Sequence, residues 1–295
     1  MPPSIRGFDS ADFGVGNADS TALQVGSGAR SFFQRPGGVA GIVIMGIVIL
    51  TAVLAPLIVR TDPLAISGPP LLSPSPAHLM GTDGLGRDLL SGVTLGASAS
   101  LFIALSVGVL ALVTGLSIGL VAGYRGGFID EALMRFTELF QVLPRFFLVA
   151  VSIALFGPGM SHMILALGLT SWPVLARVFR SEVVTMRNLD FVAATEALGA
   201  SRFYMLSRVF IPHVIPSLLV LFGAMIGQVL LMEASLGFLG LGDPSVMTWG
   251  LLAGQSQSFL RVAWWLSVFP GLAIMVTVIG FNLFADSLSV DLHSR

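Results

Sequence analysis

The chain has 295 residues, of which 55% are hydrophobic and only 11% are charged, and its formal net charge is −1. A soluble chain carries about 25% charged residues, so this composition excludes an ordinary soluble domain and indicates a protein that uses lipid as its solvent. The near-neutral charge gives no sign of nucleic-acid binding. Cysteine is absent and the four histidines are scattered, which argues against thiolate chemistry and a metal cluster.

All fifteen basic residues are arginine, so the chain contains no lysine. A P-loop needs a lysine that reaches the nucleotide phosphates. The chain therefore cannot form this type of ATP site alone, and any ATP hydrolysis that drives it must belong to another subunit.

The first third of the chain predicts a tail, a span and an external segment. Residues 1–36 are rich in Gly, Ser, Asp and Ala and are typical of a flexible tail. The uncharged run 37–59 is long enough to cross about 30 Å of hydrocarbon, which places the first transmembrane helix at 37–60. The segment 61–93 is rich in proline, which favours extended chain outside the membrane.

Five further transmembrane helices are expected within 94–288. The second lies in the uncharged run 91–123, and the Gly-Pro-Gly turn at 157–159 separates the third from the fourth. The expected bounds of the last four spans are about 136–156, 160–177, 211–232 and 263–285. The sequence thus predicts an all-α membrane protein with six transmembrane helices.

The arginines are distributed unequally between the two sets of alternating loops. Eleven of the fifteen lie in the set that contains both termini and the connector between the fourth and fifth spans. Because positive residues stay on the cytoplasmic side, both termini and this connector are expected to be cytoplasmic.

The connector contains a short predicted helix at 190–199. Asp190 is a suitable N-cap, Phe191, Ala194 and Leu198 share one helical face, and Gly199 suits the left-handed residue that ends a helix. A helix of about two turns is not stable alone in water. Its apolar face must pack either on a soluble partner or on this chain's own spans and the lipid headgroups.

A second helix is expected directly after this one. Ser201 can cap it, Phe203, Leu206 and Phe210 are expected to lie on one face, and Pro212 is expected to stop or bend it.

The connector resembles the cytoplasmic loop of ABC importer permeases, whose signature is E-A-A, three residues, G, nine residues and I-x-L-P. Gly199 is followed after nine residues by VFIP (209–212), which matches the spacing. The E-A-A triplet, however, falls on AAT (193–195), and the nearest glutamate is Glu196. The stabilisation that a glutamate at Ala193 would supply is therefore absent.

Four further blocks resemble C-type permeases of dipeptide, oligopeptide and nickel importers, in the order found in that group. They are HLMGTDGLGRDLLSG (78–92), GLVAGYRGGFIDEALMR (119–135), EASLGFLGLGDPSVMTWG (233–250) and WWLSVFPGLAIMVTVIGFNLFADSL (264–288). The end of the chain, SVDLHSR, departs from the group's pattern.

The resemblance implies the fold of a type I ABC importer permease in the inner membrane, with a cytoplasmic coupling helix in the loop 178–210. It implies four kinds of partner: a second homologous permease subunit, one or two ABC ATPase subunits that bind ATP and Mg²⁺, an extracytoplasmic binding protein, and membrane lipid. No cofactor is expected in this chain itself. The residues implied to couple to the ATPase are Asp190, Phe191, Ala194, Thr195, Glu196, Ala197, Leu198, Gly199 and Ser201.

Polar residues in spans avoid lipid and face a bundle interior or a cavity. Gln228, Glu233 and Asn282 are therefore candidates to line a pathway, with helix packing as the alternative. Glu233 is expected near a membrane interface, where its charge costs little.

Peptides are the first expectation for the substrate, with nickel, oligosaccharides and glutathione-like molecules left open. A self-contained secondary carrier would show inverted repeats and an acid deep in a span. A membrane enzyme would show a polar catalytic constellation at the interface. The sequence shows no clear sign of either.

Overall fold

The computed structural model describes residues 36–59 and 65–293, so the expected tail lies outside the described residues except for Pro36. This part of the chain is helical, and besides helices and loops it shows only two isolated β-bridges. The long helices are α2 (Pro36–Ile58), α3 (Leu89–Arg125), α4 (Gly127–Val142), α5 (Arg145–Phe156), α6 (Met160–Arg187), α9 (Ile211–Phe238) and α11 (Trp265–His293). The expected all-α membrane fold is confirmed.

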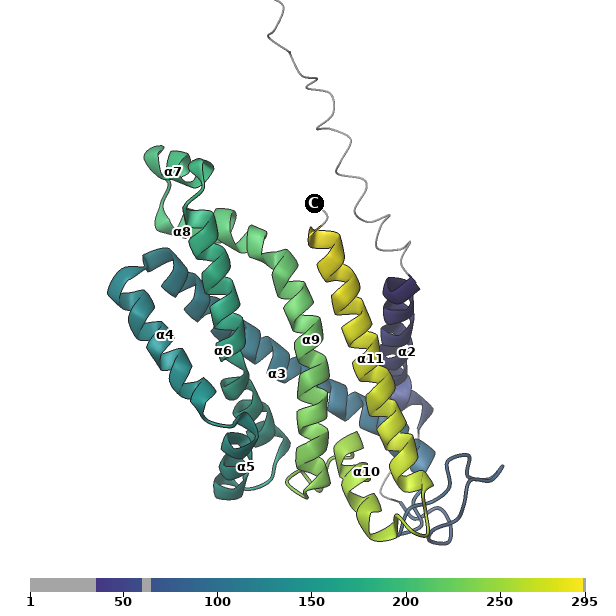
Figure 1. The fold of residues 1–295 in the computed structure, drawn as a ribbon. Coiled ribbons are helices and arrows are strands. Elements are labelled where there is room, and N and C mark those ends of the chain that lie inside the picture. Colours follow the sequence, from purple (N-terminus) through teal and green to yellow (C-terminus); the bar gives the residue numbers. More distant parts are fainter. Residues whose placement is uncertain (1–35, 60–64, 294–295) are drawn as a thin grey trace, which may run out of the picture.

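Successive spans run back and forth between two ends of the bundle (Figure 1). The short helix α7 (Asp190–Ala197), the start of α2 and the end of α11 lie at one end, which we call the α7 end. The short helix α10 (Trp249–Gln255) lies at the opposite end, which we call the α10 end. The described ends of the chain thus share the end that carries α7.

The third expected span is not one straight helix. Within the described residues, five helices can each cross a membrane alone, and α4 and α5 pass the same test only as a pair that bends by 79°. Leu143 is extended at the break, with φ −82° and ψ 132°, because a proline disfavours the helical conformation of the residue before it, here Pro144. The expected span 136–156 therefore joins the second half of α4 to all of α5.

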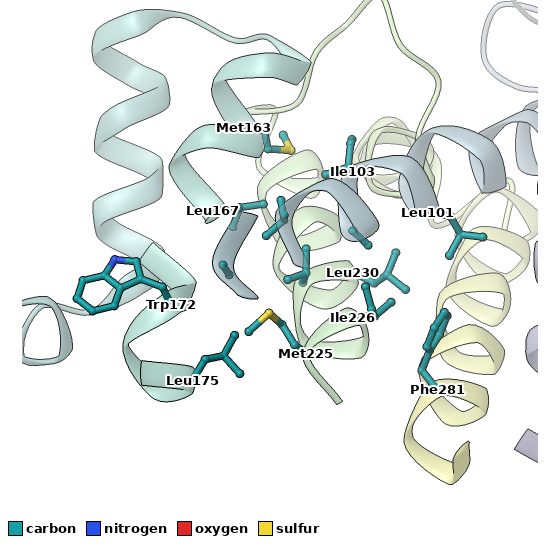
Figure 2. Packing of buried hydrophobic residues seen from close by; sticks show 14 of the residues in the cluster. Leu101, Ile103, Met163, Leu167, Trp172, Leu175, Met225, Ile226, Leu230 and Phe281 are labelled. Carbon is teal, nitrogen blue, oxygen red and sulfur yellow. The ribbon is translucent and has the colours of Figure 1, made fainter. Parts of the chain in front are cut away.

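Helix α3 packs most closely on α6, and glycines make this possible. A Cβ atom added to Gly115 would lie 2.7 Å from Leu175 Cβ, and one added to Gly119 would lie 2.6 Å from the Ala176 carbonyl oxygen. These glycines are four residues apart, so they form one stripe on α3 along which the two backbones approach each other. Leu175 and Trp172 of α6, with Ile226 and Leu230 of α9, belong to the same buried cluster (Figure 2).

The segment before α3 is a compact loop held by side-chain hydrogen bonds, although its prolines predicted extended chain. The Thr82 hydroxyl donates to the Pro69 carbonyl at 2.7 Å, and Asp88 caps α3 by accepting from the Ser91 amide at 2.9 Å. Asp88 also pairs with His78 at 3.0 Å. Burial raises the pKa of Asp88, but hydrogen bonds from His78 and Ser91 outweigh it, so the pKa lies below its usual value.

At the α10 end, Asp243 connects the loop after α9 to the start of α6. Its carboxylate accepts a hydrogen bond from the Met160 amide at 3.0 Å and another from the Ser245 amide at 2.9 Å. Hydrogen bonds from Ser245 lower the pKa of Asp243. The contact supplies an acceptor to the first turn of α6, whose N-cap Gly159 has no side chain to offer.

Candidate functional site: the α7 helix and the polar residues of the spans

Helix α7 ends in the motif that its sequence predicts. Gly199 has φ +85°, the Gly199 amide donates to the Glu196 carbonyl at 2.9 Å, and the Ala200 amide donates to the Thr195 carbonyl at 3.3 Å. This pair of bonds is the Schellman motif, in which glycine takes the left-handed conformation.

The start of α7 differs from the prediction by one residue. Leu189, in extended conformation, is the N-cap, and no side-chain hydrogen bond caps the helix. Asp190 is the first helical residue, so the assignment of Asp190 as the N-cap was wrong. Its carboxylate still lies in the first turn, where it interacts favourably with the helix dipole.

One side of α7 packs on this chain, and the rest is left open. Val192 is 1% exposed and anchors the helix, and the Phe191 ring stacks on His213 with centroids 5.9 Å apart. Leu198, by contrast, is 90% exposed. Ala194, Glu196 and Ala197 are also exposed. The face expected to contact a partner is therefore uncovered in this chain.

The segment after α7 forms α8 (Arg202–Tyr204), which continues through the π-helix η2 (Met205–Phe210) into α9. Ser201 caps α8 as predicted, because its hydroxyl accepts from the Tyr204 amide at 3.2 Å. The expectation that Phe203 and Phe210 share a face was wrong. Phe203 is 80% exposed whereas Phe210 is fully buried; the i→i+5 bonding of a π-helix changes the spacing of side chains around the axis.

The three polar candidates in the spans differ in exposure, and Asn282 lies beside Gly227, the neighbour of Gln228 in the chain. Gln228 of α9 and Asn282 of α11 are exposed, whereas Glu233 of α9 is 1% exposed. Gln228 and Asn282 remain candidates to line a pathway, but Glu233 is enclosed by protein in this conformation.

Glu233 lies close to the end of α9, but it is buried by protein, so the expectation that its charge would cost little there was wrong. Its Oε2 atom accepts from the Ser100 hydroxyl of α3 at 3.4 Å, and Ser100 in turn accepts from the Trp249 amide at 3.1 Å. The other carboxylate oxygen has no hydrogen-bond partner among the described residues. A Cβ atom on Gly250 would lie 3.0 Å from this oxygen. Glu233 therefore links α9 to α3 and α10, a role that needed contacts from distant parts of the sequence.

Sequence reasoning placed Arg145 within the third span, at the inner boundary or paired, but it did not find the polar site where α4 meets α5. Arg145 begins α5, and its Nη2 atom donates to the Ser171 hydroxyl of α6 at 2.5 Å. Its Nε atom is buried and has no partner among the described residues. The signal was Pro144, which marks the break and places Arg145 at a helix start instead of inside a span.

Known proteins are similar to this chain in sequence, and a solved structure is similar to it in fold. The di/tripeptide transport system permease protein DppC of Pseudomonas aeruginosa (strain UCBPP-PA14) is 33% identical over 267 residues, which cover 88% of each chain. The glutathione transport system permease protein GsiD of Pectobacterium atrosepticum is 33% identical over 216 residues, covering 73% of this chain and 72% of that protein. A chain of the MetNI methionine ABC transporter, solved in inward-facing conformations, superposes with a TM-score of 0.53 at 18% identity and covers 68% of this chain and 97% of that one.

The match to a family model extends over the bent pair, α7 and the last spans. The family described as binding-protein-dependent transport system inner membrane component matches residues 115–295. The chain is a multi-pass membrane protein, and it belongs to this family of inner membrane components of binding-protein-dependent transport systems.

Proposed function

We propose that this chain is one of two membrane subunits of an ATP-driven importer and forms half of the pathway for di- or oligopeptides. The observation that carries the proposal is α7, a two-turn helix at the end of the bundle with Leu198 90% exposed. Such a helix needs a surface to pack on, and Val192 anchors only one side of it. An ATPase groove would cover the open side, and the names of the relatives supply the substrate class.

The remaining partners follow from the same proposal. ATP and Mg²⁺ would bind to the ATPase subunits, because this chain lacks the lysine of a P-loop. A second permease subunit would complete the pathway, and an extracytoplasmic binding protein would deliver the peptide at the α10 end. Both termini and α7 would be cytoplasmic, consistent with the arginine-rich loops.

Uptake by the reconstituted complex tests this function. In vesicles that contain both permease subunits, the ATPase subunits and the binding protein, we expect ATP-dependent uptake of labelled dialanine. The same complex without the ATPase subunits should neither hydrolyse ATP nor accumulate peptide. Glutathione is the second candidate, because a relative carries that name; strong uptake of glutathione with none of dialanine would favour it.

The orientation can be tested by labelling, because the chain has no native cysteine. Ser73 is exposed in the loop before α3, and Ser201 is exposed beside α7. In intact cells, Ser73→Cys is expected to react with a membrane-impermeant maleimide, whereas Ser201→Cys should react only after the membrane is opened. The reverse pattern would show that the α7 end faces outward.

A further inference from the structure

A cleft of about 540 Å³ lies where the α4–α5 bend faces α6. Two arginines line it, Arg145 at the start of α5 and Arg177 on α6, together with the polar side chains of Gln141, Thr170 and Ser171. The cleft therefore contains two guanidinium groups that come from different helices.

Neither arginine forms an ion pair with the described residues, although Arg177 also lines the neighbouring cleft that contains Asp130, Glu131 and Glu138. Among the described residues, the ion pairs to arginine are those of Arg135 with Glu131 and Glu138, and of Arg180 with Asp130. Arg180 makes two bonds to Asp130, at 2.7 and 2.6 Å. Arg145 has only the Ser171 hydroxyl, and its buried Nε atom is unpaired. The described lining of this cleft thus holds two arginines and no carboxylate.

The depth of the cleft constrains what can face it. Ser171, which accepts the hydrogen bond from Arg145, lies about 16 Å along α6 from its start at about 1.5 Å per residue, inside the span expected at 160–177. A charged side chain within a span faces a protein interior or a water-filled cavity and avoids lipid. The part of the cleft that holds Arg145 is therefore expected to face the pathway. Arg177 is exposed and lies at the proposed cytoplasmic end of the same expected span.

The donors in the cleft suit a carboxylate. Guanidinium groups bind carboxylates through paired, charge-assisted hydrogen bonds. The first turn of α5, which has no side-chain cap, adds backbone N–H groups and the positive end of the helix dipole. A phospholipid phosphate offers similar chemistry, but it stays at the membrane surface, away from Arg145, which is bonded to Ser171 inside the span.

We propose that Arg145 and Arg177 form an anion subsite in the translocation pathway that binds the terminal carboxylate of the peptide in transit. This inference rests on the proposed function, because it takes a free peptide as the substrate. The subsite binds the C-terminal carboxylate, which every linear peptide with a free C-terminus carries. It therefore selects for that group and does not discriminate between side chains.

Protection of a single cysteine tests the subsite without the binding protein. Val174 lines the cleft and is 59% exposed, while Val53 of α2 is 66% exposed on another side of the bundle. In the assembled complex, Val174→Cys should react with an impermeant maleimide and Val53→Cys, facing lipid, should not. Dialanine at millimolar concentration should slow the labelling of Val174→Cys, whereas dialaninamide, which lacks the carboxylate, should leave it unchanged.

Substitutions then identify the groups responsible. Arg177→Gln and Arg145→Gln should each remove the protection by dialanine and lower its uptake about tenfold or more, the effect of losing a hydrogen bond to a charged group. Arg145→Lys keeps the positive charge and should retain part of the protection and part of the uptake. This partial activity would show that the loss in Arg145→Gln is not caused by misfolding. Arg135→Gln is the matched control, since Arg135 is exposed and paired with glutamates, and it should behave as the wild type.

The subsite would be overturned by equal protection from dialanine and dialaninamide, by protection that survives Arg177→Gln, or by an effect of the arginines that follows the content of anionic lipid in the vesicles. Absence of dialanine uptake by the wild-type complex would instead reject the proposed function. Uptake by the wild type without protection would reject the subsite alone.

Discussion

Replacing Leu198 with aspartate is expected to abolish transport while leaving the membrane fold intact. The side chain is 90% exposed in this chain, so a charge there does not disturb folding. In a packed contact with an ATPase groove, the same charge would be buried without a partner, at a cost of about 3–5 kcal/mol. Co-purification of the ATPase subunits, measured beside peptide uptake, should show both lost.

Two further variants make this result specific. Leu260→Asp places the same charge at an exposed site at the α10 end, and it should retain the ATPase subunits. Gly199→Val should weaken docking through about 1–2 kcal/mol of backbone strain, whereas Gly199→Asn, which tolerates positive φ, should be milder. If Leu198→Asp retains docking and uptake at normal levels, α7 is not the coupling element and rests on its own chain or on lipid.

Among the substitutions proposed for this chain, replacing Gly119 with leucine is expected to cause the largest loss of stability of the membrane fold. Its Cβ would lie 2.6 Å from the Ala176 carbonyl oxygen and 2.8 Å from Phe179 Cβ, so α3 and α6 would have to separate. Overpacking of this kind costs about 1–3 kcal/mol, or more where backbone must move. The midpoint of thermal unfolding in detergent should fall clearly. Gly46→Leu in α2, where nothing lies within 4 Å of the added Cβ, is the matched control; equal midpoints for the two variants would contradict the close packing.

The features that could be predicted from the sequence were local ones. Gly199 and Ser201 were assigned correctly because a helix end depends on hydrogen bonds within a few residues. The spans followed from long uncharged runs, since length and hydropathy alone decide whether a helix can cross a membrane. The N-cap at Leu189 was missed because leucine offers no side-chain acceptor. The known preference for aspartate at N-caps favoured the next residue, Asp190.

The features that could not be predicted from the sequence depend on contacts between residues that are distant in the sequence. Glu233 is buried because Ser100, 133 residues earlier, lies beside it, and no local pattern contains that information. Helix α10 is too short to show a periodic signal, and its place depends on Trp249, whose indole donates to the Val93 carbonyl at 2.8 Å. The bend at Leu143 was readable from Pro144, but the span was placed at 136–156 beside the uncharged run that begins at residue 146.

Pro173 marks a position at which α6 can bend, between Ser171 and Arg177. It lies inside the helix, where its missing N–H leaves the hydrogen-bond ladder open and allows a bend. Arg145 is bonded to Ser171 on one arm of the helix, and Arg177 lies on the other arm, which continues to α7. A change in the bend of α6 at Pro173 would change the distance between the two guanidinium groups. A displacement of α7 by the ATPase would therefore strengthen or weaken the binding of a carboxylate between them.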